Sequence, residues 1–167
     1  MKEIHQSLKR RRVDHLVGII SDTHGIVRQE ALDALRGSDL IIHAGDIGKP
    51  EIINELRAIA PVVAVRGNVD TEAWANHFHK TEAVDFDGTS IYIIHNIAQL
   101  DIDQKTTGIN VIVYGHSHTP TIDWNNSILY FNPGSAGPKR FKLPVSVGLL
   151  RISATSITPE IITLNEL

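Results

Sequence analysis

Short apolar runs alternate with segments of helical spacing through the first part of the chain. The run HLVGIIS, residues 15–21, is typical of a buried strand, and the apolar positions of residues 27–37 recur as on one face of a helix. The same alternation continues through a strand, a helix that starts near Pro50 and a further strand, at residues 39–45, 51–60 and 61–67. This β-α-β-α-β order predicts parallel strands joined by right-handed crossovers.

Strands that pair with their neighbours in sequence dominate the second half. Residues 81–95 predict a hairpin that turns at Asp87-Gly88, and residues 121–132 predict one that turns at Asn125-Asn126. A short helix, a buried strand and a strand-rich segment are predicted at residues 98–108, 110–115 and 145–164. A parallel first half and a largely antiparallel second half predict the α/β (α+β) class, as a four-layer αββα sandwich of two mixed β-sheets flanked by helices.

Length and charge set the expected domain organisation. The chain has 167 residues, and basic residues concentrate near its start, in the run KRRR at residues 9–12. We therefore expect a basic N-terminal extension over residues 1–14, followed by a single domain over residues 15–167. The net charge of −3 argues against a dedicated nucleic-acid-binding protein, and no apolar run reaches the length of a membrane span.

Two residue counts narrow the chemistry. The chain has nine histidines and no cysteine. The absence of cysteine excludes disulfides, a thiolate metal site and a cysteine nucleophile, and it fits the reducing cytoplasm in which we expect the protein. Histidine is the commonest protein ligand of transition metals, so a metal site built from imidazole and oxygen ligands is the leading candidate.

Side chains that bind metals follow five of the predicted strands, at the point where each strand ends. They are two carboxylates, one amide and four imidazoles: Asp22, His24, Asp46, Asn68, His95, His116 and His118. Because ligands of open α/β sheets bind at the carboxyl ends of the strands, we expect these side chains to meet. Gly25, Gly45, Gly67 and Gly115 stand beside them and would permit unusual φ values and close backbone approach. Seven ligands exceed the need of one tetrahedral zinc ion and suit two divalent ions, which clamp the attacking and leaving oxygens in phosphoryl transfer.

These residues belong to motifs that occur in the order SDTHG, HAGD, RGNVD, a lone histidine at a strand end, and GHSH. The ordered set resembles the calcineurin-like metallophosphoesterase superfamily. NPGS at residues 132–135 matches a segment found after the last motif in its small, cap-free branch, the YfcE/MJ0936-type phosphodiesterases. The resemblance runs from His15 to the C-terminus and implies two divalent metal ions. Mn²⁺ is the ion that we expect first, and Fe, Zn²⁺, Ni²⁺, Co²⁺ and Mg²⁺ are the alternatives.

The resemblance also implies a role for each ligand. Each ion takes three ligands of its own and shares one carboxylate, so the sets are Asp22, His24 and His118, then Asn68, His95 and His116, with Asp46 as the bridge. A metal-bridging hydroxide is then the nucleophile, and the catalytic assignment falls on Asp46, Asn68 and His95. His43 and Asp70 are expected to make hydrogen bonds around the ligands rather than to bind metal.

Two departures from the superfamily pattern bear on turnover. Val69 stands where many members have a histidine that helps to protonate the leaving group. We therefore expect better hydrolysis of activated phosphodiesters than of substrates with poor leaving groups. Asn96 follows His95 where glycine is frequent, so the loop beside the second ion also departs from the pattern.

The leading hypothesis is a dinuclear metal-dependent phosphoesterase that hydrolyses phosphodiester or, alternatively, phosphomonoester bonds of a small-molecule substrate. The rival hypothesis is a metal-binding interaction scaffold of the same fold with little or no turnover, as in the retromer subunit that resembles this superfamily but has lost ligand residues. A nuclease that uses the basic extension is a third and less favoured hypothesis, since nucleic acid is not the expected partner. A homodimer or homotetramer would match the small branch.

Overall fold

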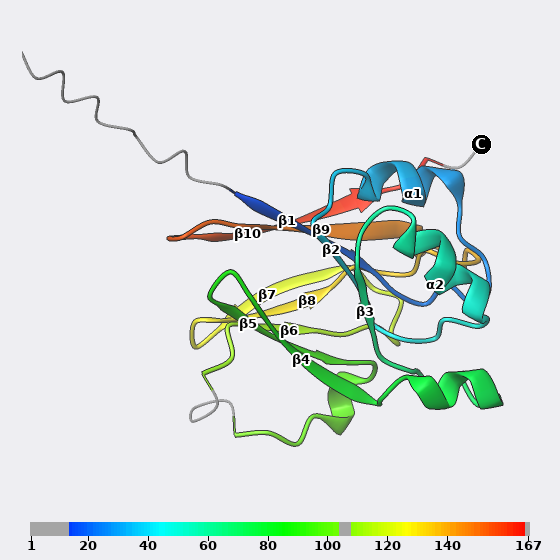
Figure 1. The fold of residues 1–167 in the computed structure, drawn as a ribbon, viewed down its shortest axis with the longest axis horizontal. Coiled ribbons are helices and arrows are strands. Elements are labelled where there is room, and N and C mark those ends of the chain that lie inside the picture. Colours follow the sequence, from blue (N-terminus) through cyan, green and yellow to red (C-terminus); the bar gives the residue numbers. More distant parts are fainter. Residues whose placement is uncertain (1–13, 104–107, 166–167) are drawn as a thin grey trace, which may run out of the picture.

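Two five-stranded sheets pack face to face in the protein, and the computed structural model describes residues 14–103 and 108–165 (Figure 1). The strands of the first sheet are, in spatial order, β10 (Ile157–Thr163), β9 (Ser146–Ile152), β1 (His15–Ile20), β2 (Leu40–His43) and β3 (Val62–Ala64). Those of the second sheet are β4 (Thr81–Phe86), β5 (Thr89–Ile94), β6 (Val111–Val113), β8 (Ile128–Asn132) and β7 (Thr121–Asn125).

Both sheets mix parallel and antiparallel pairs. In the first sheet β1, β2 and β3 are parallel, as the alternation of strands and helices predicts, and β9 is antiparallel to both β1 and β10. In the second sheet the hairpin partners β4 and β7 are antiparallel to their neighbours, whereas β5, β6 and β8 are parallel to one another. The predicted class, a sandwich of two mixed sheets with helical cover, is confirmed.

Two α-helices cover the outer face of the first sheet (Figure 1). They are α1 (Gln29–Leu35) and α2 (Pro50–Arg57). Leu35 of α1 belongs to one buried cluster with Ile20 of β1. A Cβ atom on Gly18 would lie 2.7 Å from Cδ2 of Leu35, so the glycine allows α1 to approach the sheet.

The main core lies between the two sheets. It joins Val17 and Ile19 of the first sheet to Ile91 and Phe131 of the second, and all four side chains are fully buried. Because α1 and α2 cover the other face, β1 and β2 are buried on both sides, which explains their nearly continuous apolar sequence.

The outer face of the second sheet is covered by a short 3-10 turn, η2 (Ile97–Gln99), and the residues after it. The prediction of a helix over residues 98–108 is wrong in the part that the structure describes, since residues 100–103 and 108 are not helical. Asn96 caps η2 by accepting a hydrogen bond from the Ala98 amide at 3.0 Å. Beyond it, Leu100 and Ile102 pack on the sheet, a spacing of two that does not suit a helix.

The two hairpins differ in how well the sequence predicts their turns. The first turns at Asp87-Gly88 as predicted, and both residues have positive φ. The second turns one residue later than predicted, at Asn126-Ser127, with φ values of 49° and 65°. Asn125 pairs with Ile128 instead of entering the turn, and this register keeps Leu129 and Phe131 on the core side.

Several expectations lie at the margins of the described structure. Of the basic extension over residues 1–14, the structure describes only Asp14, so that prediction lies outside the described residues. A second 3-10 turn, η1 (Ala73–His77), connects the two sheets and has no counterpart in the sequence predictions. None of the described helices has the length and apolar character needed to cross a bilayer.

Candidate metal centre

The structure brings all seven predicted ligands to one place between the two sheets. Four of them follow strands of the first sheet and three follow strands of the second, at the carboxyl end of each strand. The strands and the ligands that follow them are β1 with Asp22 and His24, β2 with Asp46, β3 with Asn68, β5 with His95, and β6 with His116 and His118. In both sheets, therefore, the predicted metal ligands lie just beyond the carboxyl ends of the strands.

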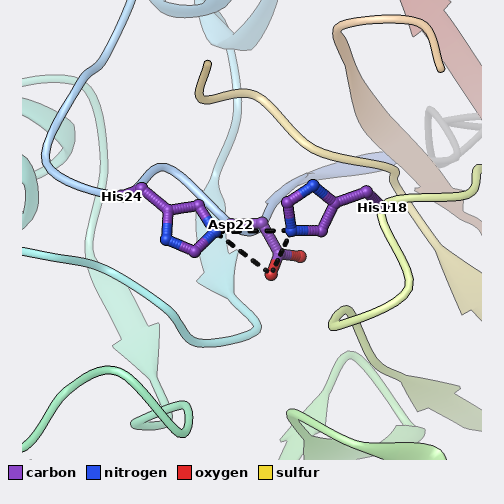
Figure 2. Close-up of side chains that lie close together, drawn as sticks. All are labelled: Asp22, His24 and His118. Carbon is purple, nitrogen blue, oxygen red and sulfur yellow. Dashed lines mark hydrogen bonds and ion pairs between the residues drawn. The ribbon is translucent and has the colours of Figure 1, made fainter. Parts of the chain in front are cut away.

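The first group of ligands consists of Asp22, His24 and His118, and Figure 2 shows the three side chains converging. His118 Nε2 lies 3.3 Å from Asp22 Oδ1 and 3.3 Å from His24 Nε2. Two atoms that bind one ion at about 2.1 Å lie about 3.0–3.4 Å apart, so this spacing suits a shared metal ion.

The second group consists of Asp46, His95 and His116, and Asn68 completes it. His95 Nε2 lies 3.3 Å from Asp46 Oδ2 and 3.1 Å from Asn68 Oδ1. Asn68 Oδ1 also lies 3.1 Å from His116 Nδ1. An amide oxygen, two imidazoles and a carboxylate therefore face one point.

Asp46 connects the two groups. Its Oδ2 atom lies 3.8 Å from His24 Nε2 in the first group and 3.3 Å from His95 Nε2 in the second. The other oxygen, Oδ1, accepts a hydrogen bond from the Val69 amide at 3.1 Å. The carboxylate is thus held so that one oxygen faces both groups, which is the position that a bridging ligand needs.

Hydrogen bonds at Asp22 and His95 leave the ligating atoms free. Asp22 Oδ2 accepts bonds from Ser21 Oγ at 2.7 Å and from the His116 amide at 3.1 Å, whereas its buried Oδ1 has no hydrogen-bond partner in the described part of the chain. His95 Nδ1 donates to the Ala44 carbonyl at 2.7 Å, so its Nε2 can present a lone pair to a metal ion. A buried acceptor without a partner costs about 1–3 kcal/mol, and a divalent cation would remove that cost. The residues present therefore fit a metal ion.

The pKa values at the site reflect burial and the two carboxylates. Burial lowers the pKa of His24, and the nearby charges do not reverse that shift. Burial also acts to lower the pKa of His95, but the hydrogen bond to Asp46 and the charges of Asp22 and Asp46 outweigh it and raise the pKa. His95 in turn holds the pKa of the Asp46 carboxyl below its usual value, against the effect of burial. The raised pKa means that protons compete with a metal ion for His95.

Most of the ligands adopt left-handed backbone conformations. Five of the seven have positive φ, although none is a glycine: Asp22 (54°), His24 (47°), Asp46 (55°), His116 (69°) and His118 (59°). Such a conformation costs about 1–2 kcal/mol for a residue with a side chain. The sequence reasoning missed this feature because it assigned unusual φ only to the neighbouring glycines.

The four glycines beside the ligands have two different roles. Gly25 and Gly45 have positive φ, at 82° and 98°, as predicted. Gly67 and Gly115 do not, and they serve close approach instead. A Cβ on Gly67 would overlap the Asp46 carboxylate, and one on Gly115 would overlap Ser21 Oγ.

Asp70 and His43 hold the loops that carry the ligands and do not join either ligand group. The Asp70 carboxylate accepts hydrogen bonds from the amides of Ile47, Gly48 and Gly67 at 3.0, 2.9 and 2.8 Å, which ties the loop after β2 to the loop after β3.

The fully buried His43 ring accepts a hydrogen bond at Nδ1 from the Gly45 amide at 3.1 Å, so its Nε2 carries the proton and donates to Thr23 Oγ1 at 2.9 Å. Burial lowers the pKa of His43 to about 4, so the ring stays neutral while it makes these bonds.

The segment NPGS contains two supporting residues that sequence reasoning did not assign. Asn132 Nδ2 donates to the Gly115 carbonyl at 3.0 Å and Ser135 Oγ donates to the Asp22 carbonyl at 3.0 Å. These bonds hold the first and last ligand loops together. The motif itself, which strengthened the family resemblance, was the signal that could have identified them.

Comparison with known proteins now identifies the family. A family model described as "Calcineurin-like phosphoesterase superfamily domain" matches residues 16–155. The chain belongs to this superfamily. It is 33% identical over 159 residues to the "Probable metallophosphoesterase" of Methanothermobacter thermautotrophicus, with 88% of this chain and 91% of the relative covered.

Two further likenesses refine the picture of this superfamily member. The chain is 29% identical over 163 residues to phosphodiesterase YfcE of Escherichia coli, with 82% of this chain and 88% of the relative covered. The solved structure of vacuolar protein sorting 29 from Cryptosporidium parvum superimposes with a TM-score of 0.78 at 20% identity, covering 92% of this chain and 93% of that chain. The first likeness confirms the resemblance to YfcE-type phosphodiesterases, and the second shows the fold alone.

A cavity of about 590 Å³ opens beside the second ligand group of this phosphoesterase fold. Asn68, His95 and His116 line it, together with other residues of the loop after β3 such as Arg66 and Thr71. Val69 is 44% exposed in that loop, with an aliphatic side chain at the position where many superfamily members carry a histidine. A molecule bound at the second group can therefore extend into the cavity.

Proposed function

We propose that the protein is a dinuclear metal-dependent phosphoesterase that hydrolyses phosphodiester bonds of small-molecule substrates. The observation that carries this proposal is the Asp46 carboxylate, whose Oδ2 faces both ligand groups while the Val69 amide holds Oδ1. Asp22, with its buried and unpartnered Oδ1, supports it, because a cation held between this oxygen and the imidazole of His118 would satisfy that atom.

The ligands divide the work of holding two ions. Asp22, His24 and His118 would hold one ion, Asn68, His95 and His116 the other, and Asp46 both. When bound, two divalent cations supply a hydroxide nucleophile from water near neutral pH and neutralise charge on the phosphoryl oxygens. Mn²⁺ is the ion that we propose first, since imidazole and oxygen ligands without sulfur suit it.

The chain's own residues set the geometry and the choice of leaving group. Asp70 and His43 fix the ligand loops through backbone amides and Thr23, so the donors stay in place before substrate arrives. Val69 has no proton to donate to a departing alkoxide. We therefore propose that the protein prefers diesters whose leaving group is a weak base.

The test is metal-dependent hydrolysis of bis(para-nitrophenyl) phosphate, beside the monoester para-nitrophenyl phosphate. The chelated protein should be inactive and should recover with Mn²⁺. His95→Gln should lose about 100-fold or more in kcat/KM, while His77→Gln, an exposed histidine of η1, should keep wild-type activity. Full activity in the chelated protein, or in the His95 variant, would contradict the proposal.

A metal-binding interaction scaffold of the same fold is the second candidate, and the likeness in fold to vacuolar protein sorting 29 is the observation that favours it. Metal analysis combined with the same assay separates the two. Two bound ions per chain without turnover of either ester would support the scaffold, and metal-dependent turnover would exclude it as the main function.

A further inference from the structure

The cavity lies beside the second ligand group and is not lined by residues of the first. Asn68, His95 and His116 line it, whereas Asp22, His24 and His118 do not. Its volume of about 590 Å³ falls in the range of small-molecule sites and exceeds what a single phosphoryl group fills. A phosphodiester held at the ligands would therefore place one of its two organic groups in the cavity.

Two cationic side chains line the cavity, Arg66 from the loop after β3 and Lys80 beside β4. Within the described residues neither forms an ion pair with a carboxylate. The Arg66 guanidinium donates through one terminal nitrogen to the Asn76 side chain at 3.3 Å, and its Nε is buried without a hydrogen-bond partner among the described residues. Both cations that line the cavity therefore lack a carboxylate partner among the described residues.

Nearby carboxylates do not offset these charges. Asp70 is the one carboxylate among the lining residues that the structure describes, and its two oxygens already accept three backbone hydrogen bonds. Glu82, next along β4, is held at 2.9 Å by His79. Arg36 on α1, by comparison, has an ion pair with Asp33 at 3.0 Å.

The uncompensated charges point to an anionic ligand. The cations Arg66 and Lys80 would repel each other and nearby metal ions, and an anion bound between them would remove that repulsion. Arg binds phosphate through several donors and Lys binds it as a point charge, and Thr71 and Thr81 also line the cavity.

We infer that this cavity is a phosphate subsite, so that the preferred substrate is a phosphodiester whose organic group carries a second, terminal phosphate. The inference rests on the proposed phosphodiesterase activity, because it names the substrate class of that same site. Arg66 and Lys80 would bind the terminal phosphate, while ions at the two ligand groups would bind the phosphoryl group that reacts.

Two chromogenic substrates test the inference directly. They are the para-nitrophenyl ester of thymidine 5′-phosphate and the same ester with an added 3′-phosphate, so they differ only in the terminal phosphate. With the Mn²⁺-loaded protein, we expect kcat/KM to be about tenfold higher for the substrate with the 3′-phosphate, mainly through a lower KM. The double variant Arg66→Gln/Lys80→Gln should bring this ratio close to one. Arg57→Gln, an exposed arginine of α2 outside the cavity, should keep the wild-type ratio.

A binding measurement separates failure of the subsite from failure of the function. Calorimetry should show tighter binding of thymidine 3′,5′-bisphosphate than of thymidine 5′-phosphate, and the double variant should lose the difference. If neither ester is hydrolysed but this difference holds, the proposed function fails and the subsite stands. If the esters are hydrolysed equally well, or if the ratio persists in the double variant, the subsite inference is overturned and the proposed function stands.

Discussion

Asp22 combines three features that are each unfavourable in a folded protein. Its backbone is left-handed, its side chain is fully buried, and its Oδ1 atom has no hydrogen-bond partner in the described chain. Ser21 and the His116 amide satisfy only Oδ2. Residues held in such conformations concentrate at functional sites, and a bound cation would turn the unpaired oxygen into a favourable contact.

Replacing Asp22 by asparagine should separate stability from metal binding. Asparagine tolerates left-handed φ, its oxygen can keep both hydrogen bonds, and its amide can donate to the imidazoles of His24 or His118. In the presence of a chelator, Asp22→Asn should therefore raise the free energy of unfolding by about 1–2 kcal/mol. Urea denaturation with chelator and with Mn²⁺ measures both effects, and the variant should gain much less than wild type from Mn²⁺. A variant that is less stable than wild type in chelator would count against this view of Asp22.

At the scale of elements, what the sequence could predict follows from how the strands are buried. β1 and β2 have helices on one face and the second sheet on the other, so their apolar runs are continuous and their ends are sharp. The polar residues just beyond those ends, such as Asp22 and Asp46, could be predicted to lie together because strand ends meet at one edge.

Features that depend on tertiary contacts could not be predicted from the sequence in the same way. Asp46 has a left-handed φ, which aspartate adopts more readily than most residues but which nothing in its local sequence requires. The Val69 amide, from the loop after β3, holds its carboxylate. The turn at Asn126-Ser127 depends on the register that buries Phe131, whereas the adjacent asparagines favoured a turn one residue earlier. The helix predicted over residues 98–108 does not continue beyond η2, because Leu100 and Ile102 both pack on the second sheet.

A matched pair of glycine substitutions tests the geometry of the ligand loops. In Gly67→Ala the added Cβ would overlap the Asp46 carboxylate and backbone amide, so the bridging oxygen should shift and metal-dependent activity should fall at least about tenfold. Gly88→Ala places a Cβ in open space at a φ of 79° in the β4–β5 turn. It should cost about 1 kcal/mol of stability and leave activity unchanged. Kinetics and urea denaturation on both variants measure these effects, and equal activity losses would show that the close approach at Gly67 is unimportant.

For the whole molecule, the metal centre lies where the two sheets meet. Each ligand group combines residues from both sheets, since Asp22 and His24 face His118, and Asp46 and Asn68 face His95 and His116. Bound ions would therefore link the two sheets at one edge of the sandwich, beyond the apolar contacts of the central core. Metal binding and global unfolding should be coupled.

Removal of metal should consequently lower the melting temperature of the whole protein. An ion present at 100 times its Kd stabilises a folded protein by about 2.7 kcal/mol. At this chain length 1 kcal/mol corresponds to about 2–4 °C in Tm, so each ion should raise Tm by about 5–10 °C. Calorimetric scans with chelator and with increasing Mn²⁺ should show one transition that moves upward with metal concentration. Asp46→Asn should lose most of this shift because Asp46 faces both groups, and His77→Gln should retain it. A Tm that ignores Mn²⁺, or that rises equally in Asp46→Asn, would mean that the two ligand groups do not hold ions across the sheets.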